Sequence, residues 1–230
     1  MEIQGLDNTT KKNLLSFLIE FVTDERKQRF LDVVEKRTKY ITIALEDIFQ
    51  PHNASAVLRS CDCFGIQNVH IIENKFKYNV NPDVALGSPK WLDLFRYDNT
   101  EFNTIECLTK LKNDGYRIIA TTPHKNDCLI DEMPLDNKIA LVFGTELNGL
   151  TEKAIQMADG FVKIPMYGFT ESYNISVSAA LSLYELTKRL RTSVSDWELT
   201  PEEKTDVLIK WCLNSVNKSD MLLRKFFNKK

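Results

Sequence analysis

The stretch that decides the fold is residues 139–151, which read IALVFGTELNGLT. Its first five residues form an uninterrupted apolar run, as expected for a strand that is buried on both faces of a parallel sheet. Gly144 and Gly149 then form a loop with the glycine spacing of a phosphate-binding loop, but Leu150 stands where that motif needs a lysine. The loop is therefore either a simple turn or part of another kind of binding site, with Glu146 as a candidate buried carboxylate.

Short strand-like runs and helical stretches alternate on both sides of this segment. The expected strands are residues 41–45, 69–72, 117–121, 139–143 and 161–164. The expected helices are residues 51–65, residues 100–115 with Thr100 as cap, a short helix capped by Thr151, and residues 174–191. Strands that alternate with helices are typical of an α/β domain with a mostly parallel sheet, and we expect this fold class for the middle of the chain.

Both ends of the chain are expected to be helical. Residues 8–36 have apolar residues at helical spacing in two segments, with candidate caps at residues 8–10. The tetrapeptide Thr-Pro-Glu-Glu at 200–203 is a strong helix start, and a last helix follows Ser219. We divide the chain into a helical arm, 1–39, an α/β domain, 40–191, and a basic helical extension, 192–230.

Charge is unevenly distributed along the chain. The 230 residues have a net charge of −2, but residues 204–230 carry seven Lys or Arg against two Asp, a local charge of +5. Such a basic tail is either a solvated surface or an arm that binds phosphates. No apolar run approaches the ~18 residues of a membrane span, and the first residues, MEIQ, do not read as a signal peptide. We therefore expect a cytoplasmic protein.

Cysteine and histidine side chains offer a weak alternative, a metal site. Cys61 and Cys63 could combine with His52, His70 and His124. One residue between two cysteines does not match the usual zinc spacings, and the sequence has no second pair. We expect these two thiols to be buried, and no metal is predicted.

The loops after the strands hold further candidate site residues, because parallel sheets bind ligands beyond the carboxyl ends of their strands. Asn53 and Arg59 follow the first strand near a helix start, and we expect them on broadly similar helix faces, where they could bind an anion. A capping asparagine and a solvated arginine are the alternative. Residues 164–180 are rich in small and hydroxyl side chains, which suit either a site or a closely packed helix.

Three motifs together resemble one known family. They are Asn53-x5-Arg59, then Gly144-Thr145-Glu146-x2-Gly149-Leu150, then Ile164-Pro165-Met166 followed by SYNISV at 172–177. In order and spacing they resemble the SpoU family, the TrmH-like branch of the SPOUT RNA methyltransferases, over about residues 40–190. The resemblance implies an α/β fold with a deep C-terminal trefoil knot, an exception to the usual unknotted topology. It also implies a homodimer that uses S-adenosylmethionine to methylate ribose 2′-hydroxyls of structured RNA.

The resemblance also assigns roles to residues of this sequence. The catalytic residues it implies are Arg59, Asn53, Glu146, Ser172 and Asn174. The cofactor-binding residues it implies are Thr121, Gly144, Ile164, Met166, Tyr173 and Asn174, with Tyr173 in place of the leucine that is common there. The RNA-binding residues would be Arg59, Lys218, Arg224, Lys225, Lys229 and Lys230. Arg59 would act either as a base or, as we favour, by holding an RNA phosphate, because guanidinium groups rarely lose a proton.

The flanking segments refine the expected substrate. A short helical arm and a basic C-terminal extension resemble the layout of family members that methylate guanosine 18 in the D-loop of tRNA. The partners implied are therefore tRNA and a second copy of the chain, and neither DNA nor a membrane. Methylation of ribosomal RNA or of another tRNA position is an alternative, as is an inactive RNA-binding protein that kept the knot.

Overall fold

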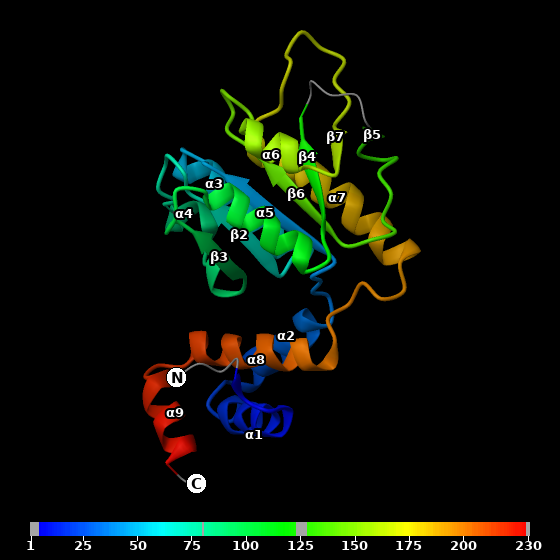
Figure 1. Ribbon diagram of the computed structural model, residues 1–230. Helices are drawn as coiled ribbons and strands as arrows, with labels where there is room; N and C mark the ends of the chain where they lie inside the picture. Colours follow the sequence, from blue (N-terminus) through cyan, green and yellow to red (C-terminus); the bar gives the residue numbers. More distant parts are fainter. Residues whose placement is uncertain (1–4, 80, 123–127, 229–230) are drawn as a thin grey trace. The chain divides into compact units, whose positions relative to one another are not determined.

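The computed structural model describes residues 5–79, 81–122 and 128–228, and the chain divides into two compact units. One unit spans Thr38–Trp197 and holds the strands that the structure describes. The other combines Met1–Arg37 with Glu198–Lys230 and is helical in its described part (Figure 1). The segments at the two ends of the sequence therefore fold together in one unit.

A seven-stranded sheet forms the centre of the α/β unit. The strands are β1 (Ile41–Glu46), β2 (Asn68–Ile72), β3 (Asp93–Tyr97), β4 (Arg117–Thr121), β5 (Cys128–Leu129), β6 (Ile139–Phe143) and β7 (Gly160–Lys163). Their order is β3-β2-β1-β6-β4-β7-β5, and the pairings between neighbouring strands are all parallel. The predicted α/β class with a mostly parallel sheet is therefore confirmed, whereas the trefoil knot stays a prediction.

Helices cover both faces of this sheet (Figure 1). They are α3 (Pro51–Phe64), α4 (Pro82–Ala85), the short 3-10 helix Ser88–Lys90, α5 (Asn103–Asn113), α6 (Glu152–Met157) and α7 (Ile175–Ser193). The core of one face joins α3 and α7 to the odd-numbered residues of β1, and the core of the other joins α5 and α6 to Ala44. Every residue of β1 and β6 is buried, as their apolar runs predicted.

Local signals placed most element ends correctly. Gly65 ends α3 in the left-handed conformation with φ 80°, and Thr151 caps α6. The prediction that Thr100 caps α5 is wrong: the helix starts at Asn103, and the Thr100 hydroxyl donates to Asn103 Oδ1 at 2.9 Å. The Thr100 hydroxyl oxygen accepts the amide of Phe102 at 3.2 Å, so Thr100 belongs to a turn that precedes the helix.

The helical unit consists of α1 (Asn8–Ile19), α2 (Asp24–Val34), α8 (Pro201–Ser215) and α9 (Ser219–Phe227). Asp7, rather than residues 8–10, caps α1, because its carboxylate accepts the amides of Thr9 and Thr10 at 3.0 Å. Thr200 forms the expected capping box with Glu203. Trp211 is fully buried against Phe30, with ring centroids 5.5 Å apart, and forms part of the centre of this unit.

His70 gives the α/β unit a pH-dependent stability. It is buried on β2, stacks on Phe95 and Tyr97, and its Nδ1 lies 3.1 Å from the Tyr97 hydroxyl. Burial, helped by the nearby Lys110 charge, lowers its pKa to about 4. The folded pKa therefore lies below the unfolded value of 6.5, so stability is unaffected above that value and falls as the pH drops from 6.5 towards 4.

We expect His70→Phe to remove this loss while keeping the stacked ring. Denaturant titrations at pH 7 and pH 4.5 should show a stability decrease that is smaller in the variant, by up to roughly 3 kcal/mol. The comparison between variant and wild type cancels the titration of carboxylates that both proteins share. An identical decrease in both proteins would show that His70 is not the titrating group.

Candidate active site

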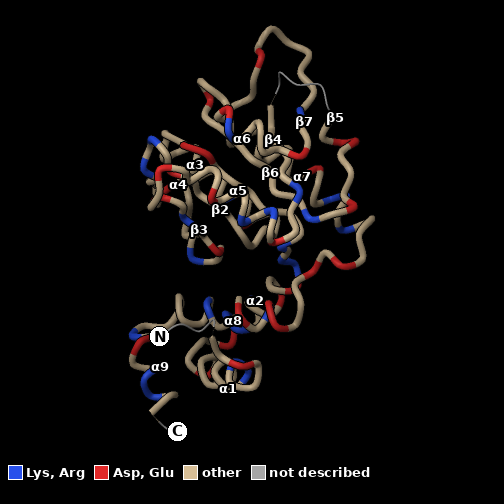
Figure 2. The backbone as a smooth tube through the Cα atoms, in the orientation of Figure 1, with Lys and Arg blue, Asp and Glu red and all other residues tan. Residues whose placement is uncertain are grey.

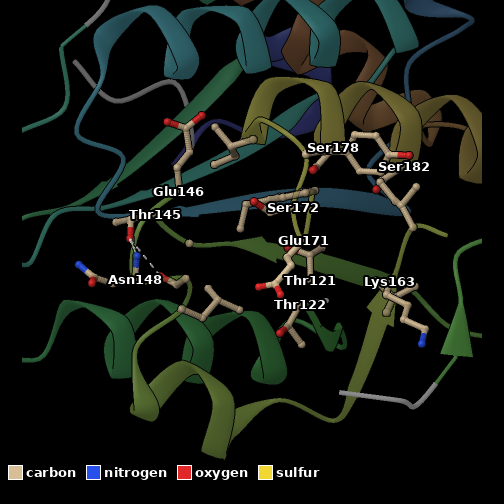
Figure 3. Close-up of a pocket in the computed structure, with 18 of the residues that line it drawn as sticks. Thr121, Thr122, Thr145, Glu146, Asn148, Lys163, Glu171, Ser172, Ser178 and Ser182 are labelled. Carbon is tan, nitrogen blue, oxygen red and sulfur yellow. Dashed lines mark hydrogen bonds between the residues drawn. The ribbon is translucent and has the colours of Figure 1, made fainter. Parts of the chain in front are cut away.

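A cavity of about 370 Å³ opens at the carboxyl ends of β4, β6 and β7 (Figure 3). These three strands end at one edge because they are parallel and adjacent. The structure brings five of the six predicted cofactor residues to its wall: Thr121, Gly144, Ile164, Met166 and Tyr173. Asn174 lies beside the cavity rather than in its lining. Figure 3 shows further polar residues around the same space to which the resemblance assigns no role: Thr122, Thr145, Asn148, Lys163, Glu171, Ser178 and Ser182.

The loop after β6 closes on itself at one side of this cavity. Thr145 and Gly149 exchange two backbone hydrogen bonds of 3.0 and 2.9 Å, and the amide of Asn148 donates to the Thr145 hydroxyl at 3.0 Å. Gly149 has φ 65°, and a Cβ on Gly144 would collide with the backbone of Gly149 and Leu150. Both glycines are therefore needed for the turn, and the turn forms the cavity wall.

Three predicted catalytic residues meet in one hydrogen-bond network. Asn174 Nδ2 donates to Asn53 Oδ1 at 3.2 Å and to Glu146 Oε1 at 2.5 Å. Asn174 Oδ1 accepts the Ser176 amide at 2.8 Å and so caps α7, while Asn53 Nδ2 donates to Gln50 Oε1 at 3.2 Å. The network joins the starts of α3 and α7 to the loop after β6, and these segments are far apart in the sequence.

Arg59 lies apart from this network. It is exposed on α3, lies outside the lining of the 370 Å³ cavity, and makes no hydrogen bond or ion pair within the described part of the chain. The expectation that Arg59 and Asn53 share a helix face is wrong, because six residues at 3.6 per turn rotate the side chain by about 120° away from whole turns. Asn53 is consequently buried while Arg59 faces outward. Ser172, the fifth predicted catalytic residue, lines the cavity.

The expectation that Glu146 is buried is wrong, because its side chain is exposed. Glu46, at the end of β1, is a buried carboxylate. Glu46 Oε1 accepts the hydroxyls of Thr104 and Thr151 at 2.5 and 2.7 Å, and its Oε2 accepts the Thr151 amide at 2.8 Å. These bonds compensate the burial of the charge and fix the end of β1 to α5 and to the start of α6. The signal for Glu46 is an acidic residue at the end of a mostly apolar strand.

A second cavity of about 280 Å³ adjoins the same loop and was not predicted. Its lining comprises Ile48, Phe49, Gln50, Asn53, Phe76, Thr145, Glu146, Leu147, Asn148 and Ile175. The residues at 145–148 and Ile175 line both cavities, and Arg59 lines neither. Phe49 and Phe76 are isolated phenylalanines in two different loops, so no sequence pattern marks them.

The predicted RNA-binding residues of the tail belong to the helical unit. Lys218, Arg224 and Lys225 are exposed before and on α9, and Figure 2 shows basic positions in blue along this helix. Lys229 and Lys230 lie outside the described residues. The apolar side of α9 is half-buried, and Phe226 packs on Phe17 with ring centroids 5.5 Å apart. The helix therefore packs through its apolar side and presents its charges outward.

The other candidates have less structural support. Within residues 5–79, 81–122 and 128–228, no three His, Cys, Asp or Glu side chains are grouped as a metal ion requires, and His124 falls outside these ranges. Cys61 is buried as expected, but Cys63 is exposed, because only one of two residues two positions apart on α3 can face the sheet. Among the described helices none is long and apolar enough to cross a membrane.

Comparison with known proteins supplies the context for this geometry. A family model described as the SpoU rRNA Methylase family matches residues 40–184. The tRNA (guanosine(18)-2′-O)-methyltransferase of Borreliella burgdorferi is 45% identical over 86% of this chain and 88% of its own length. The enzyme of the same name from Thermus thermophilus is 33% identical, over 82% of this chain and 96% of its own. The crystal structure of the A. aeolicus TrmH/SpoU tRNA modifying enzyme superposes with a TM-score of 0.75 and 31% identity, over 85% of this chain and 98% of that one.

Proposed function

Because the chain belongs to the SpoU methylase family, we propose that it transfers a methyl group from S-adenosylmethionine to a ribose 2′-hydroxyl of tRNA, at guanosine 18. One structural observation carries the proposal: Asn53, Glu146 and Asn174, one from each motif, form a single network beside the cavity that holds the predicted cofactor residues. The position, guanosine 18, is supported by the names of the two relatives. Since its substrate is tRNA, we place the enzyme in the cytoplasm.

The larger cavity fits the methyl donor. Phe143, Ile164 and Met166 supply an apolar wall for the adenine base, while hydroxyls and backbone groups supply polar partners for the methionine part. The Tyr173 hydroxyl donates to the Pro165 carbonyl at 3.1 Å and links the two arms of the last motif. This bond gives Tyr173 a role that the leucine common in the family could not have. When bound, S-adenosylmethionine would supply an electrophilic methyl group on a positively charged sulfur.

We assign to the residues in and near the network the task of positioning and activating the ribose 2′-hydroxyl. A hydroxyl attacks well only when its proton is removed or its developing charge is stabilised, with the reacting atoms about 3–3.5 Å apart. Arg59 has no partner among the described residues and can therefore pair with an RNA phosphate, which positions the ribose and stabilises the negative charge that develops on the 2′-oxygen. Asn174, held between Asn53 and Glu146, orients the sugar.

A second copy of the chain would complete this site. Arg59 lies outside the two cavities of its own protomer, so we propose that it serves the cavity of a partner in a homodimer. Val177, Leu181 and Tyr184 recur at helical spacing on α7 and are 44%, 41% and 55% exposed. This apolar row continues from the motif that starts the helix, so it is the surface that we assign to the dimer.

Leu181→Lys should therefore convert the dimer to a monomer and abolish methylation. Light scattering at micromolar concentration should show the wild type at twice the chain mass of 26.6 kDa and the variant at that mass. Leu86→Lys is the matched control, since Leu86 is 63% exposed outside this row. A wild-type protein that is monomeric would contradict the proposal.

Charge reversal on α9 tests whether the tail binds RNA. The double variant Arg224→Glu with Lys225→Glu changes two exposed side chains and leaves the packed side of the helix intact. If both bind phosphates, tRNA affinity should fall, and the log–log salt slope should flatten by roughly 0.9 for each duplex phosphate that is no longer bound, or 0.7 on single strands. An unchanged affinity and slope would make the tail structural. Asp220→Lys is the control: it adds positive charge to the same helix, so tRNA affinity should rise or stay the same.

Calorimetry with S-adenosylmethionine separates an enzyme from an inactive RNA-binding protein. The proposed enzyme should bind one cofactor per chain and then transfer labelled methyl groups to tRNA. A protein that binds tRNA but gives no heat with the cofactor would support the inactive alternative. Transfer to ribosomal RNA in place of tRNA would support the alternative substrate that the family description names.

A further inference from the structure

Two exposed phenylalanines stand beside the catalytic network. Phe49 is 66% exposed and Phe76 is 38% exposed, and their ring centroids lie 4.9 Å apart in an edge-to-face pair. Both rings line the 280 Å³ cavity, together with Asn53 and Glu146 of the network. Resting on the proposed function, we propose that this cavity binds the base of the target nucleotide, stacked on the Phe49–Phe76 pair.

The loops that carry the pair are held in place by a buried carboxylate. Asp47 has φ 54° and is 4% exposed, and its Oδ1 accepts the amides of Asn74 and Lys75 at 2.7 and 2.8 Å. Its Oδ2 accepts Asn74 Nδ2 at 3.2 Å. The loop after β2 is thereby fixed to the loop after β1, close in sequence to each aromatic residue. An exposed aromatic pair on such an ordered support is a preformed surface rather than a collapsed apolar contact.

The position of the Phe49–Phe76 pair indicates which ligand it binds. The two cavities share residues 145–148 and Ile175, so one loop separates the predicted methyl-donor site from the aromatic pair. A nucleotide whose ribose lies at the network between them would extend its base toward Phe49 and Phe76. Enzymes that modify one nucleotide commonly take its base out of the stack and hold it against aromatic or apolar side chains. The apolar lining from Ile48, Leu147 and Ile175 suits the flat face of a base.

The test combines a protein variant with a change in the substrate. Wild type, Phe49→Ala and Phe76→Ala are assayed on tRNA and on the same tRNA with an abasic ribose at the target position. Stacking on one aromatic side chain corresponds to a loss on the order of tenfold to a hundredfold. On intact tRNA we expect Phe49→Ala to have a kcat/KM that is lower than the wild-type value by this tenfold to hundredfold. The wild type should lose a similar factor when the intact tRNA is replaced by the abasic tRNA. On the abasic tRNA, kcat/KM of Phe49→Ala should be little lower than that of the wild type.

Matched controls separate stacking from folding. Phe102→Ala removes another exposed ring, 59% exposed and outside both cavities, and should keep wild-type activity. Phe49→Trp should retain activity because it keeps a stacking surface. Equal losses for Phe49→Ala on both substrates would overturn the proposal, as would a Phe49→Ala protein that turns monomeric, since the pair would then contact a second copy. A wild type that methylates no tRNA would instead overturn the proposed function.

Discussion

Replacement of Arg59 by alanine should reduce methyl transfer to tRNA by roughly a thousandfold and leave the affinity for S-adenosylmethionine unchanged. Removal of one group that stabilises developing charge costs roughly 10²–10³ in turnover in other enzymes, and the variant would also be unable to pair with the phosphate. Cofactor binding should survive because the proposed partner of Arg59 is the RNA phosphate and not the cofactor. Arg59→Lys should also fail where bidentate contact to the phosphate matters.

The measurement pairs labelled methyl transfer with calorimetry. Arg117→Ala is a suitable control. Arg117 lies at the amino-terminal end of β4, away from the cavity at the carboxyl ends of the strands, and pairs with Asp136 at 3.2 Å on the surface. Loss of such a surface pair has little effect on stability. Wild-type turnover by Arg59→Ala would remove Arg59 from the mechanism, and loss of cofactor binding would place it in the donor site instead.

Gly144→Ala should weaken S-adenosylmethionine binding by tenfold to a hundredfold or more. The added Cβ would collide with the backbone of Gly149 and Leu150. Backbone atoms cannot move away by a rotamer change, as the end of a flexible side chain can. The turn at 144–150 must therefore open. Overpacking of this kind costs about 1–3 kcal/mol. If this cost falls on the cofactor-bound state, it corresponds to the tenfold to hundredfold loss of affinity for S-adenosylmethionine. Its two Thr145–Gly149 hydrogen bonds would be strained or broken.

Gly168→Ala is the matched control for this prediction. No atom lies within 4 Å of a Cβ built on Gly168, so cofactor affinity should stay at the wild-type value. Thermal unfolding of both variants distinguishes a local change in the cavity from a loss of the whole fold. Unaltered affinity in Gly144→Ala would show that the turn does not shape the cofactor site.

Burial explains which strands were predictable. β1 and β6 are buried at every position; β6 is apolar throughout, and β1 is apolar and β-branched up to its last residue, Glu46. β3 reads DLFRY and lies at the edge of the sheet with only Tyr97 buried, so charged and apolar residues mix in it without a clear period. β5 has two residues and no pattern at all. A hydrophobic pattern indicates which residues of one segment are buried. It does not identify an edge strand that is half exposed to solvent, because such a strand has no clear pattern.

The site was predictable in its parts and not in its connections. The motifs identified Asn53, Glu146 and Asn174, but only the folded chain shows that Asn174 bridges the other two. Arg59 faces away from Asn53 because six residues fall about 120° short of two full helical turns. The aromatic pair arose from two loops that Asp47 joins, a contact between residues that no local pattern relates.

Mapping of the methylated nucleotide tests the central claim most directly. Purified protein is incubated with an unmodified tRNA and S-adenosylmethionine, and the RNA is digested and analysed by mass spectrometry. We predict one new modification, a methyl group on the ribose 2′-oxygen of guanosine 18 in the D-loop. A methyl group on a base, on another nucleotide, or on no tRNA at all would contradict the claim.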